Sequence, residues 1–172
     1  PYPLKKVEIP SADLGNRGLL FAGIGWYTRL EFPYLNNIME QGEYVHIEKA
    51  GLKIYPEYGT YSDFNALPDS IFLYIADENN VVTDAVKDYL GKQVQGGKLV
   101  KDDLFLGNTY YYFDVTQFMK EELGASGKYK HNLQLVFNSD DYTKTLKNLT
   151  FSAPNGQNPI ILQLNYKIYE SY

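Results

Sequence analysis

Apolar and polar residues alternate along several stretches of this chain, with the period of two that is typical of half-buried β-strands. The first stretch runs from Trp26 to Phe32 and ends at Pro33, because proline cannot donate a hydrogen bond to a neighbouring strand. The longest of the early stretches is Val45–Tyr55, in which the step Ala50-Gly51 changes the phase of the alternation. Such a phase change predicts a β-bulge at these two residues.

Other parts of the chain have the length and composition of strands or turns. A glycine pair within Gln95–Lys98 is typical of a tight hairpin turn, and the segment 84–92 has apolar residues that could form one or two helical turns. The further predicted strands are Ile71–Ala76, Asp103–Leu106, Thr109–Val115, Leu133–Phe137, Leu149–Ser152 and Ile160–Tyr169.

One helix is predicted over residues 115–123. Asp114 can cap its N-terminus, and Gln117 stands three residues further on, as in a capping box. Phe118, Met119 and Leu123 supply the apolar stripe, and Gly124 follows as the stop.

About eight to ten short strands and one short helix, without a helix between successive strands, exclude a doubly wound α/β fold. The pattern favours an all-β protein, with a two-sheet antiparallel β-sandwich of jelly-roll topology as its architecture. Residues 1–20, with three prolines, are expected to be an extended lead-in or an edge strand near Lys6–Ile9. Residues 21–172 are expected to form a single sandwich domain.

Charge and cysteine content narrow the classes of function. The chain of 172 residues has 21 acidic and 16 basic side chains, a net charge of −5, and therefore no basic surface typical of nucleic-acid or anionic-membrane binding. The absence of cysteine excludes disulfides, thiolate nucleophiles and sulfur-ligated metals. No apolar run reaches the length of a membrane span. The chain starts Pro1-Tyr2-Pro3, so we expect that a leader was removed or that the sequence lies within a longer protein.

The residues that usually carry catalysis do not form a recognisable motif. His46 and His131 belong to no metal-binding spacing, and no G-x-S-x-G motif is present for a serine nucleophile. The adjacent carboxylates of each acidic pair point apart on a strand or helix, which is unfavourable for glycoside hydrolysis. These pairs are Asp102/Asp103, Glu121/Glu122 and Asp140/Asp141. A polysaccharide hydrolase, built from carboxylates remote in sequence, stays open as a third hypothesis.

Two oxygen-rich segments partly resemble calcium-binding loops. Asp77–Val81 begins like such a loop but lacks a third oxygen ligand and the required glycine, so a β-turn is the better interpretation. Asn138–Asp141 is equally unspecific. We therefore expect no catalytic residue, no metal ligand and no cofactor.

Aromatic residues are the remaining chemical signal, since the chain has 17 tyrosines. Tyr55, Tyr58 and Tyr61 recur every three residues in a turn-rich segment, and Trp26 lies in another part of the chain. Such rings stack on sugar faces, and their polar tips hydrogen-bond to hydroxyls. The alternative is that these rings only fill the sheets, because tyrosine favours strands. These four residues are the predicted ligand-binding residues.

Several segments resemble a known group of domains. Thr28–Pro33 followed by Ile47–Tyr55 resembles the R-L-x-F … I-x-x-A-x-L-x-I-Y opening of DNRLRE-type carbohydrate-binding-like jelly-roll domains. Tyr112–Phe118 resembles their F-D-V-T segment, and Phe151–Ala153 with Pro159–Tyr166 resembles their closing strand. The Gly96-Gly97 hairpin and the segment 108–116 are more similar to a family of uncharacterised exported lipoproteins of Bacteroidetes. Ala153-Pro154 departs from the Arg-Glu pair of the DNRLRE group, so no function of that pair can be transferred.

The resemblance implies a jelly-roll sandwich that is exported to the cell envelope or the extracellular space as an outer-membrane lipoprotein. Contact with the membrane would then occur only through a lipid anchor outside this sequence. Some similar modules are thought to bind carbohydrate, and no family catalytic residue is available for transfer. We expect a non-catalytic cell-surface module that binds a glycan through loop aromatics. The alternative is a structural or protein-interaction module without a small-molecule ligand, which would dock another surface protein through an apolar patch or an edge strand.

Overall fold

A computed structural model describes residues 8–40, 44–88, 90–102, 104, 108–126, 131–152 and 159–169. Within these residues the chain forms ten strands, three α-helices and two short 3-10 helices. In chain order the elements are η1 (Ser11–Leu14), β1 (Arg17–Phe21), η2 (Ala22–Ile24), β2 (Thr28–Leu30), α1 (Asn36–Met39), β3 (Tyr44–Ile54), β4 (Ser70–Ala76), β5 (Val82–Ala85), β6 (Gly96–Val100), β7 (Tyr110–Asp114), α2 (Thr116–Ser126), β8 (Asn132–Val136), α3 (Ser139–Lys144), β9 (Asn148–Ser152) and β10 (Ile161–Tyr169). Every strand pair is antiparallel, so the prediction of a mostly antiparallel β protein is confirmed, although the described residues form three α-helices where one was predicted.

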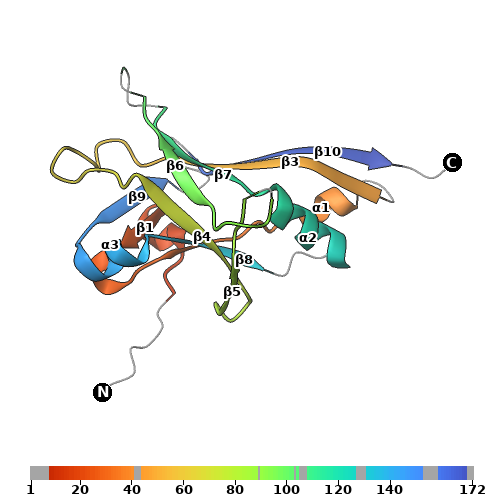
Figure 1. Ribbon diagram of the computed structural model, residues 1–172, viewed down its shortest axis with the longest axis horizontal. Helices are drawn as coiled ribbons and strands as arrows, with labels where there is room; N and C mark the ends of the chain where they lie inside the picture. The colour runs from red at the N-terminus through yellow and green to blue at the C-terminus, as the bar shows by residue number, and fades with distance from the viewer. Residues whose placement is uncertain are drawn as a thin grey trace.

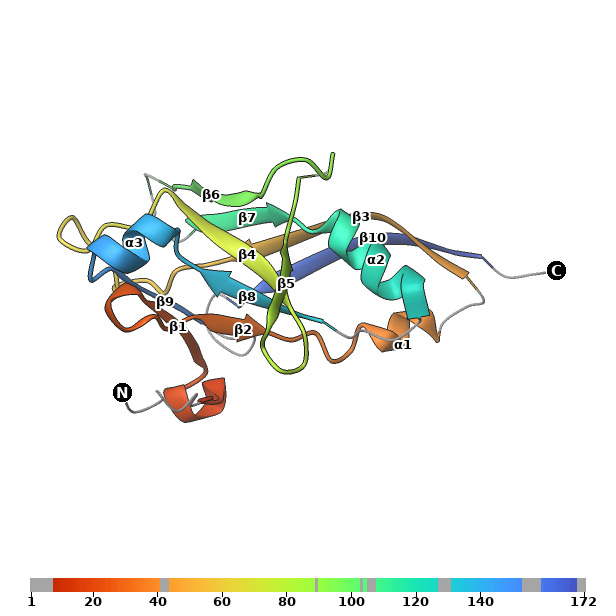
Figure 2. The ribbon, with the colours of Figure 1, turned by 60° about the horizontal axis from the view of Figure 1, so that its bottom comes forward.

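The strands form one large sheet and one small one. The large sheet has the order β10-β3-β7-β6-β4-β8-β2, with β5 beside β4, and the small sheet pairs β1 with β9. Two backbone contacts join the small pair to the large sheet. Phe21 exchanges hydrogen bonds with Trp26, just ahead of β2, and the Glu57 N–H donates to the Thr150 carbonyl, just beyond β3. The sheets therefore curl around a common core at the end of the molecule where η2 and α3 lie (Figures 1 and 2).

The core lies between the curled sheets and consists of side chains from alternate strand positions. Burial alternates along β4 and β7, and most of β3 follows the same rule, as the period of two predicts. Some of the largest fully buried side chains are Leu52, Ile54, Ile71, Leu73, Tyr111, Phe113, Leu133 and Leu135. The predicted strands at Val45–Tyr55, Ile71–Ala76 and Ile160–Tyr169 are confirmed. The first predicted strand is shorter than expected, because β2 covers only Thr28–Leu30.

The phase change in β3 occurs at a different position from the predicted one. Lys49 pairs with Asn165 and Ile47 pairs with Tyr166, so the extra residue is Glu48. Glu48 and Lys49 are consecutive exposed residues, and burial resumes at Ala50. The predicted bulge at Ala50-Gly51 is therefore wrong by two or three residues, because a sequence shows that the phase changes but not which residue is left unpaired.

The glycine pair at Gly96-Gly97 forms part of β6, so the predicted hairpin turn at these residues is wrong. A side chain on Gly97 would lie 2.2 Å from the Phe113 ring of the neighbouring β7. Glycine is needed here because an aromatic ring lies directly on the backbone.

The helix predicted over residues 115–123 is confirmed as α2. Asp114 accepts hydrogen bonds from the backbone N–H and the hydroxyl of Thr116, as expected of a cap. The predicted capping box is wrong, since the Gln117 side-chain amide donates to Glu121 instead.

The segment 84–92 shows no helix among its described residues, and β5 extends to Ala85. Lys6 and Val7 of the predicted strand Lys6–Ile9 lie outside the described residues, and Glu8 and Ile9 form no strand. Three of the four residues of Asp103–Leu106 also lie outside the described residues. β1 begins at Arg17, before the expected start of the domain at residue 21.

Tyr111 provides a test of the core that depends on pH. Its phenol is fully buried and donates to the Pro68 carbonyl at 2.6 Å. Burial, assisted by the negative charge of Asp69, raises the pKa of Tyr111 above its ordinary value of 10.0. Above pH 10 the Tyr111 phenol ionises in the unfolded chain, whereas it stays neutral in the folded chain. The stabilisation that the buried neutral phenol provides is therefore complete below pH 10 and falls as the pH rises further.

We therefore expect Tyr111→Phe to have two effects. The variant loses about 1–3 kcal/mol at neutral pH, since the Pro68 carbonyl is left without its donor. Its stability should then decline less steeply than that of the wild type above pH 10, as measured by urea unfolding across this range. Parallel profiles for the two proteins would show that the Tyr111 phenol is not buried as described.

Candidate functional site

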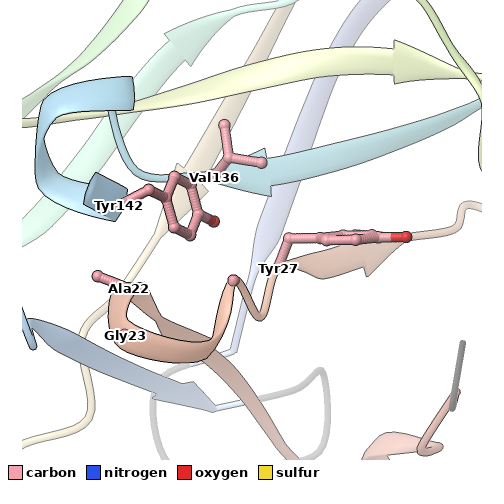
Figure 3. Close-up of a pocket in the computed structure, with 6 residues that line it drawn as sticks. Ala22, Gly23, Tyr27, Val136 and Tyr142 are labelled. Atoms are coloured by element: carbon pink, nitrogen blue, oxygen red, sulfur yellow. The ribbon is translucent and has the colours of Figure 1, made fainter. Parts of the chain in front are cut away.

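A shallow hollow lies at the end of the molecule where η2 faces α3, and its volume is about 420 Å³ (Figure 3). We call it the Tyr27–Tyr142 hollow. It is lined by Ala22, Gly23, Gly25, Tyr27, Val136 and Tyr142. These residues come from two distant parts of the chain, the turn after β1 and the segment from β8 to α3. The fold therefore brings together side chains that are more than one hundred residues apart.

One wall of the hollow is the tight turn between β1 and β2. Phe21 and Trp26 exchange two backbone hydrogen bonds of 3.2 and 3.0 Å, which close the turn around η2. Gly25 ends η2 with a φ of 70°, a conformation that favours glycine. A side chain on Gly23 would lie 2.6 Å from Leu146, so this glycine lets the turn approach the chain beyond α3. At Gly25, by contrast, no atom lies within 4 Å of where a side chain would begin, so the turn is open there.

The opposite wall is the Tyr142 ring, which α3 holds in place. The Asn138 side chain caps α3 by accepting a 2.7 Å hydrogen bond from the Asp141 N–H. The Tyr142 ring packs edge-on against Phe137, with ring centres 5.7 Å apart. Its hydroxyl donates to the Trp26 carbonyl at 3.2 Å, so the two walls are connected directly.

The phenol of Tyr142 stays protonated under ordinary conditions. Burial raises the pKa of Tyr142 above its ordinary value. Asp141 of α3 pairs with Lys147, beyond the helix, at 2.9 Å, and the Lys147 carbonyl accepts from the Ala22 N–H. The second wall is thus fixed to the first through side-chain and backbone contacts. This arrangement gives a preorganised surface of neutral groups.

The hollow is lined by aromatic, aliphatic and glycine residues, all of them uncharged. Tyr142 projects from α3, whereas Tyr27 lies just ahead of β2 and its ring extends away from Tyr142 along the rim of the space (Figure 3). No carboxylate, histidine, lysine or arginine is among the six lining residues. The hollow has the size of a small-molecule site, for which roughly 300–1,000 Å³ is usual. Aromatic faces and uncovered peptide groups can bind such a ligand, but they supply no general acid or base at neutral pH.

The four predicted ligand-binding residues lie in two separate places. Trp26 is 41% exposed and adjacent in sequence to Tyr27, but its side chain does not line the hollow. Tyr58 is 65% exposed and follows the end of β3, on the far side of β9 and β1 from Trp26. Tyr55 is half-buried, with its ring 5.5 Å from that of Tyr110, and Tyr61 is also half-buried. Trp26 and the tyrosine series therefore do not form one platform.

Tyr142 and the glycine turn are the site residues that the sequence did not suggest. Asn138–Asp141 was interpreted as a loop, whereas Asn138 caps α3 and the helix carries Tyr142. The signal that could have found it is the spacing of Asn138, Ser139 and Asp141, which is typical of a helix N-terminus. Tyr27 lies within the predicted strand from Trp26 to Phe32, yet no local pattern connects it with Tyr142.

Other ionisable groups have local structural partners. Asp77 accepts hydrogen bonds from the N–H groups of Asn79 and Val81, which confirms the β-turn interpretation. Glu122 lies beside His131, and Asp140 pairs with Lys144 at 3.2 Å. Among the residues that the structure describes, no group of three or more histidine, aspartate and glutamate side chains is placed to hold a metal ion. Asp103, the second member of one acidic pair, lies outside the described residues.

Comparison with models of protein families, with curated proteins and with solved structures finds no match for this chain. The resemblance to DNRLRE-type domains and to exported lipoproteins therefore stays a prediction. In the described part of the chain, no helix combines the length and apolar character needed to cross a bilayer.

Proposed function

We propose that this protein is a non-catalytic cell-surface module that binds a sugar unit of a glycan in the Tyr27–Tyr142 hollow. The observation that carries the proposal is an open hollow that two tyrosines from distant segments line together with a glycine turn. This site differs from the four ligand-binding residues that the sequence suggested, which are Tyr55, Tyr58, Tyr61 and Trp26.

The chemistry of a sugar ring matches these groups. A pyranose presents C–H groups on one face, which pack against the flat face of an aromatic ring, and hydroxyls at its rim. The Gly25 N–H already donates to the Ala22 carbonyl, so the sugar hydroxyls would bond to the remaining peptide groups of the turn, where the space beside Gly25 is open. A neutral sugar also needs no charged partner. An open hollow suits one or two units of a longer chain that continues into solvent.

Architecture and cellular location form part of the same proposal. The antiparallel pairing and the curled sheets support a β-sandwich, and its jelly-roll form stays a prediction. The resemblance to exported lipoproteins supports a location in the cell envelope or outside the cell. Attachment to the outer membrane would then depend on a lipid anchor outside this sequence.

A protein-interaction module is the second hypothesis, and exposed apolar side chains support it. Phe64 is fully exposed in the loop after β3, and Ile24 and Leu146 are exposed beside the hollow. Leu146 lies against the η2 turn at Gly23, so it and Ile24 belong to the same end of the molecule. Loop tips with such residues are typical of surfaces that dock another protein.

A glycan array followed by a fluorescence titration tests the proposed function. Trp26 is the single tryptophan of the chain and its carbonyl accepts from the Tyr142 hydroxyl, so its emission should report a ligand in the hollow. We expect at least one class of plant, host or microbial glycan to bind on the array. The same glycan should change the Trp26 emission in a saturable way.

Trp26→Phe is the matched control, because it removes the reporter without changing a lining residue. This variant should bind the same glycans on the array while giving no tryptophan signal. Failure of every glycan to bind the wild type would contradict sugar binding and leave protein interaction as the better hypothesis. Binding without any change in Trp26 emission would place the sugar elsewhere on the molecule.

A further inference from the structure

The two ends of the large sheet differ in how much backbone they expose. One end is β2, which has three residues, and short edge strands are a common protection against unwanted pairing. The other end is β10, which has nine residues and pairs only with β3 among the described strands. Figure 1 shows β10 beside β3 in a ribbon that extends past α1 and α2 toward the C-terminal end.

β10 lacks the features that usually prevent an edge strand from pairing. Its sequence from Ile161 to Tyr169 contains no proline and no glycine. The irregularity in its pairing with β3 leaves the extra residue, Glu48, in β3, so β10 itself is regular. Its single charged residue is Lys167, and this charge is already engaged in an ion pair with Glu48. Alternate N–H and C=O groups of β10 therefore form a long row that is suited to another strand.

We propose that β10 pairs antiparallel with β10 of a second copy of this chain, which makes the protein a symmetric dimer. The register that uses all nine residues places Asn165 opposite its own copy on the two-fold axis. Gln163 then faces Lys167, and Ile161 faces Tyr169, on the exposed face. On the inner face Leu162 meets Ile168, and Leu164 meets Tyr166.

The pairs in this register are mutually compatible. No two like charges lie opposite one another, since Lys167 faces a neutral amide. Leu162 and Leu164 are only partly buried in the single chain, so a second β10 would cover more of their surface. The pairing would join the two large sheets into one continuous sheet. It involves none of the residues of the Tyr27–Tyr142 hollow, so it is independent of the proposed sugar binding.

Opposite charges at Asn165 give a test that depends on the register. The Asn165 side chain is exposed, so Asn165→Lys and Asn165→Asp should leave the core unchanged. In a dimer centred on this residue, each variant places two like charges face to face. Each variant alone should therefore be monomeric, whereas an equimolar mixture should form a heterodimer, because the lysine then faces the aspartate.

Sedimentation equilibrium over a wide range of protein concentration measures the outcome. The wild type should approach twice the monomer mass as the concentration rises, and each variant should keep the monomer mass until the two are mixed. Asn79→Lys, in the exposed turn after β4, adds the same charge away from β10 and should dimerise like the wild type. Residue 165 lies opposite Lys49 of β3, so an aspartate at this position faces an opposite charge within its own chain. Circular dichroism checks that each variant is folded. If Asn165→Lys unfolds, Asn165→Asp alone still tests the dimer.

Three results would overturn the proposal. The first is a wild type that stays monomeric at every concentration. The second is a single variant that dimerises as strongly as the wild type. The third is a mixture of folded variants that stays monomeric, because the Asn165-centred register requires it to associate.

Discussion

Replacing Phe113 with alanine is expected to lower the free energy of unfolding by about 3–5 kcal/mol, the usual range for loss of a fully buried aromatic ring. Phe113 has no exposed surface and lies in β7 between β3, where it pairs with Leu52, and β6. Its ring also covers the backbone of Gly97. Removal of the ring leaves a cavity bounded by three strands, and such a site relaxes poorly because the strands hold one another apart.

Phe64→Ala is the matched control for Phe113→Ala, since it is the same change at a fully exposed position. We expect it to alter the stability by no more than about 0.5 kcal/mol. Urea unfolding, followed by circular dichroism, measures both variants. Equal effects on the two proteins would contradict the placement of Phe113 in the core.

Gly97→Ala is expected to destabilise the protein by about 1–3 kcal/mol, because the added methyl group overpacks the core. The new Cβ would lie 2.2 to 2.6 Å from three atoms of the Phe113 ring. The ring cannot move away easily, since it is completely buried. The same urea experiment measures this change.

Gly96→Ala is the control for Gly97→Ala, one residue earlier in the same strand. Its new Cβ would have neighbours no closer than 3.5 Å, which is ordinary van der Waals contact. Since Gly96 has no positive φ, this variant should be neutral or stabilising by up to about 1 kcal/mol. If Gly96→Ala were the more damaging of the two, the faces of β6 would be the reverse of those described.

The sequence predicted much of the fold because the period of two is a local property. The strands that became β3, β4 and β10 each carry their own alternation, and α2 carries its own cap at Asp114. Features that depend on a neighbouring strand were predicted poorly. In the sequence the two glycines of β6 resemble a turn, because only the folded structure shows the Phe113 ring lying over Gly97. The bulge at Glu48 likewise became evident only from the pairing with β10.

The candidate site was less predictable than the fold, because its two walls come from distant parts of the chain. The hydrogen bond between the Tyr142 hydroxyl and the Trp26 carbonyl joins residues 116 positions apart. No spacing of residues within one segment reports such a contact. The sequence drew attention to Trp26, which stays a prediction, while it could not show that Tyr27 and Tyr142 line the same hollow.

Titration of two tyrosine variants with a glycan selected on the array is the most direct test of sugar binding in the hollow. Tyr27→Ala removes one ring of the hollow, whereas Tyr58→Ala removes an exposed ring on the other side of β1 and β9. Trp26 emission reports binding in both. We expect Tyr27→Ala to bind roughly tenfold more weakly or worse, as follows from the loss of an aromatic contact of about 1.4 kcal/mol, and Tyr58→Ala to bind like the wild type. Unchanged affinity in Tyr27→Ala, with or without a loss in Tyr58→Ala, would contradict binding in the Tyr27–Tyr142 hollow.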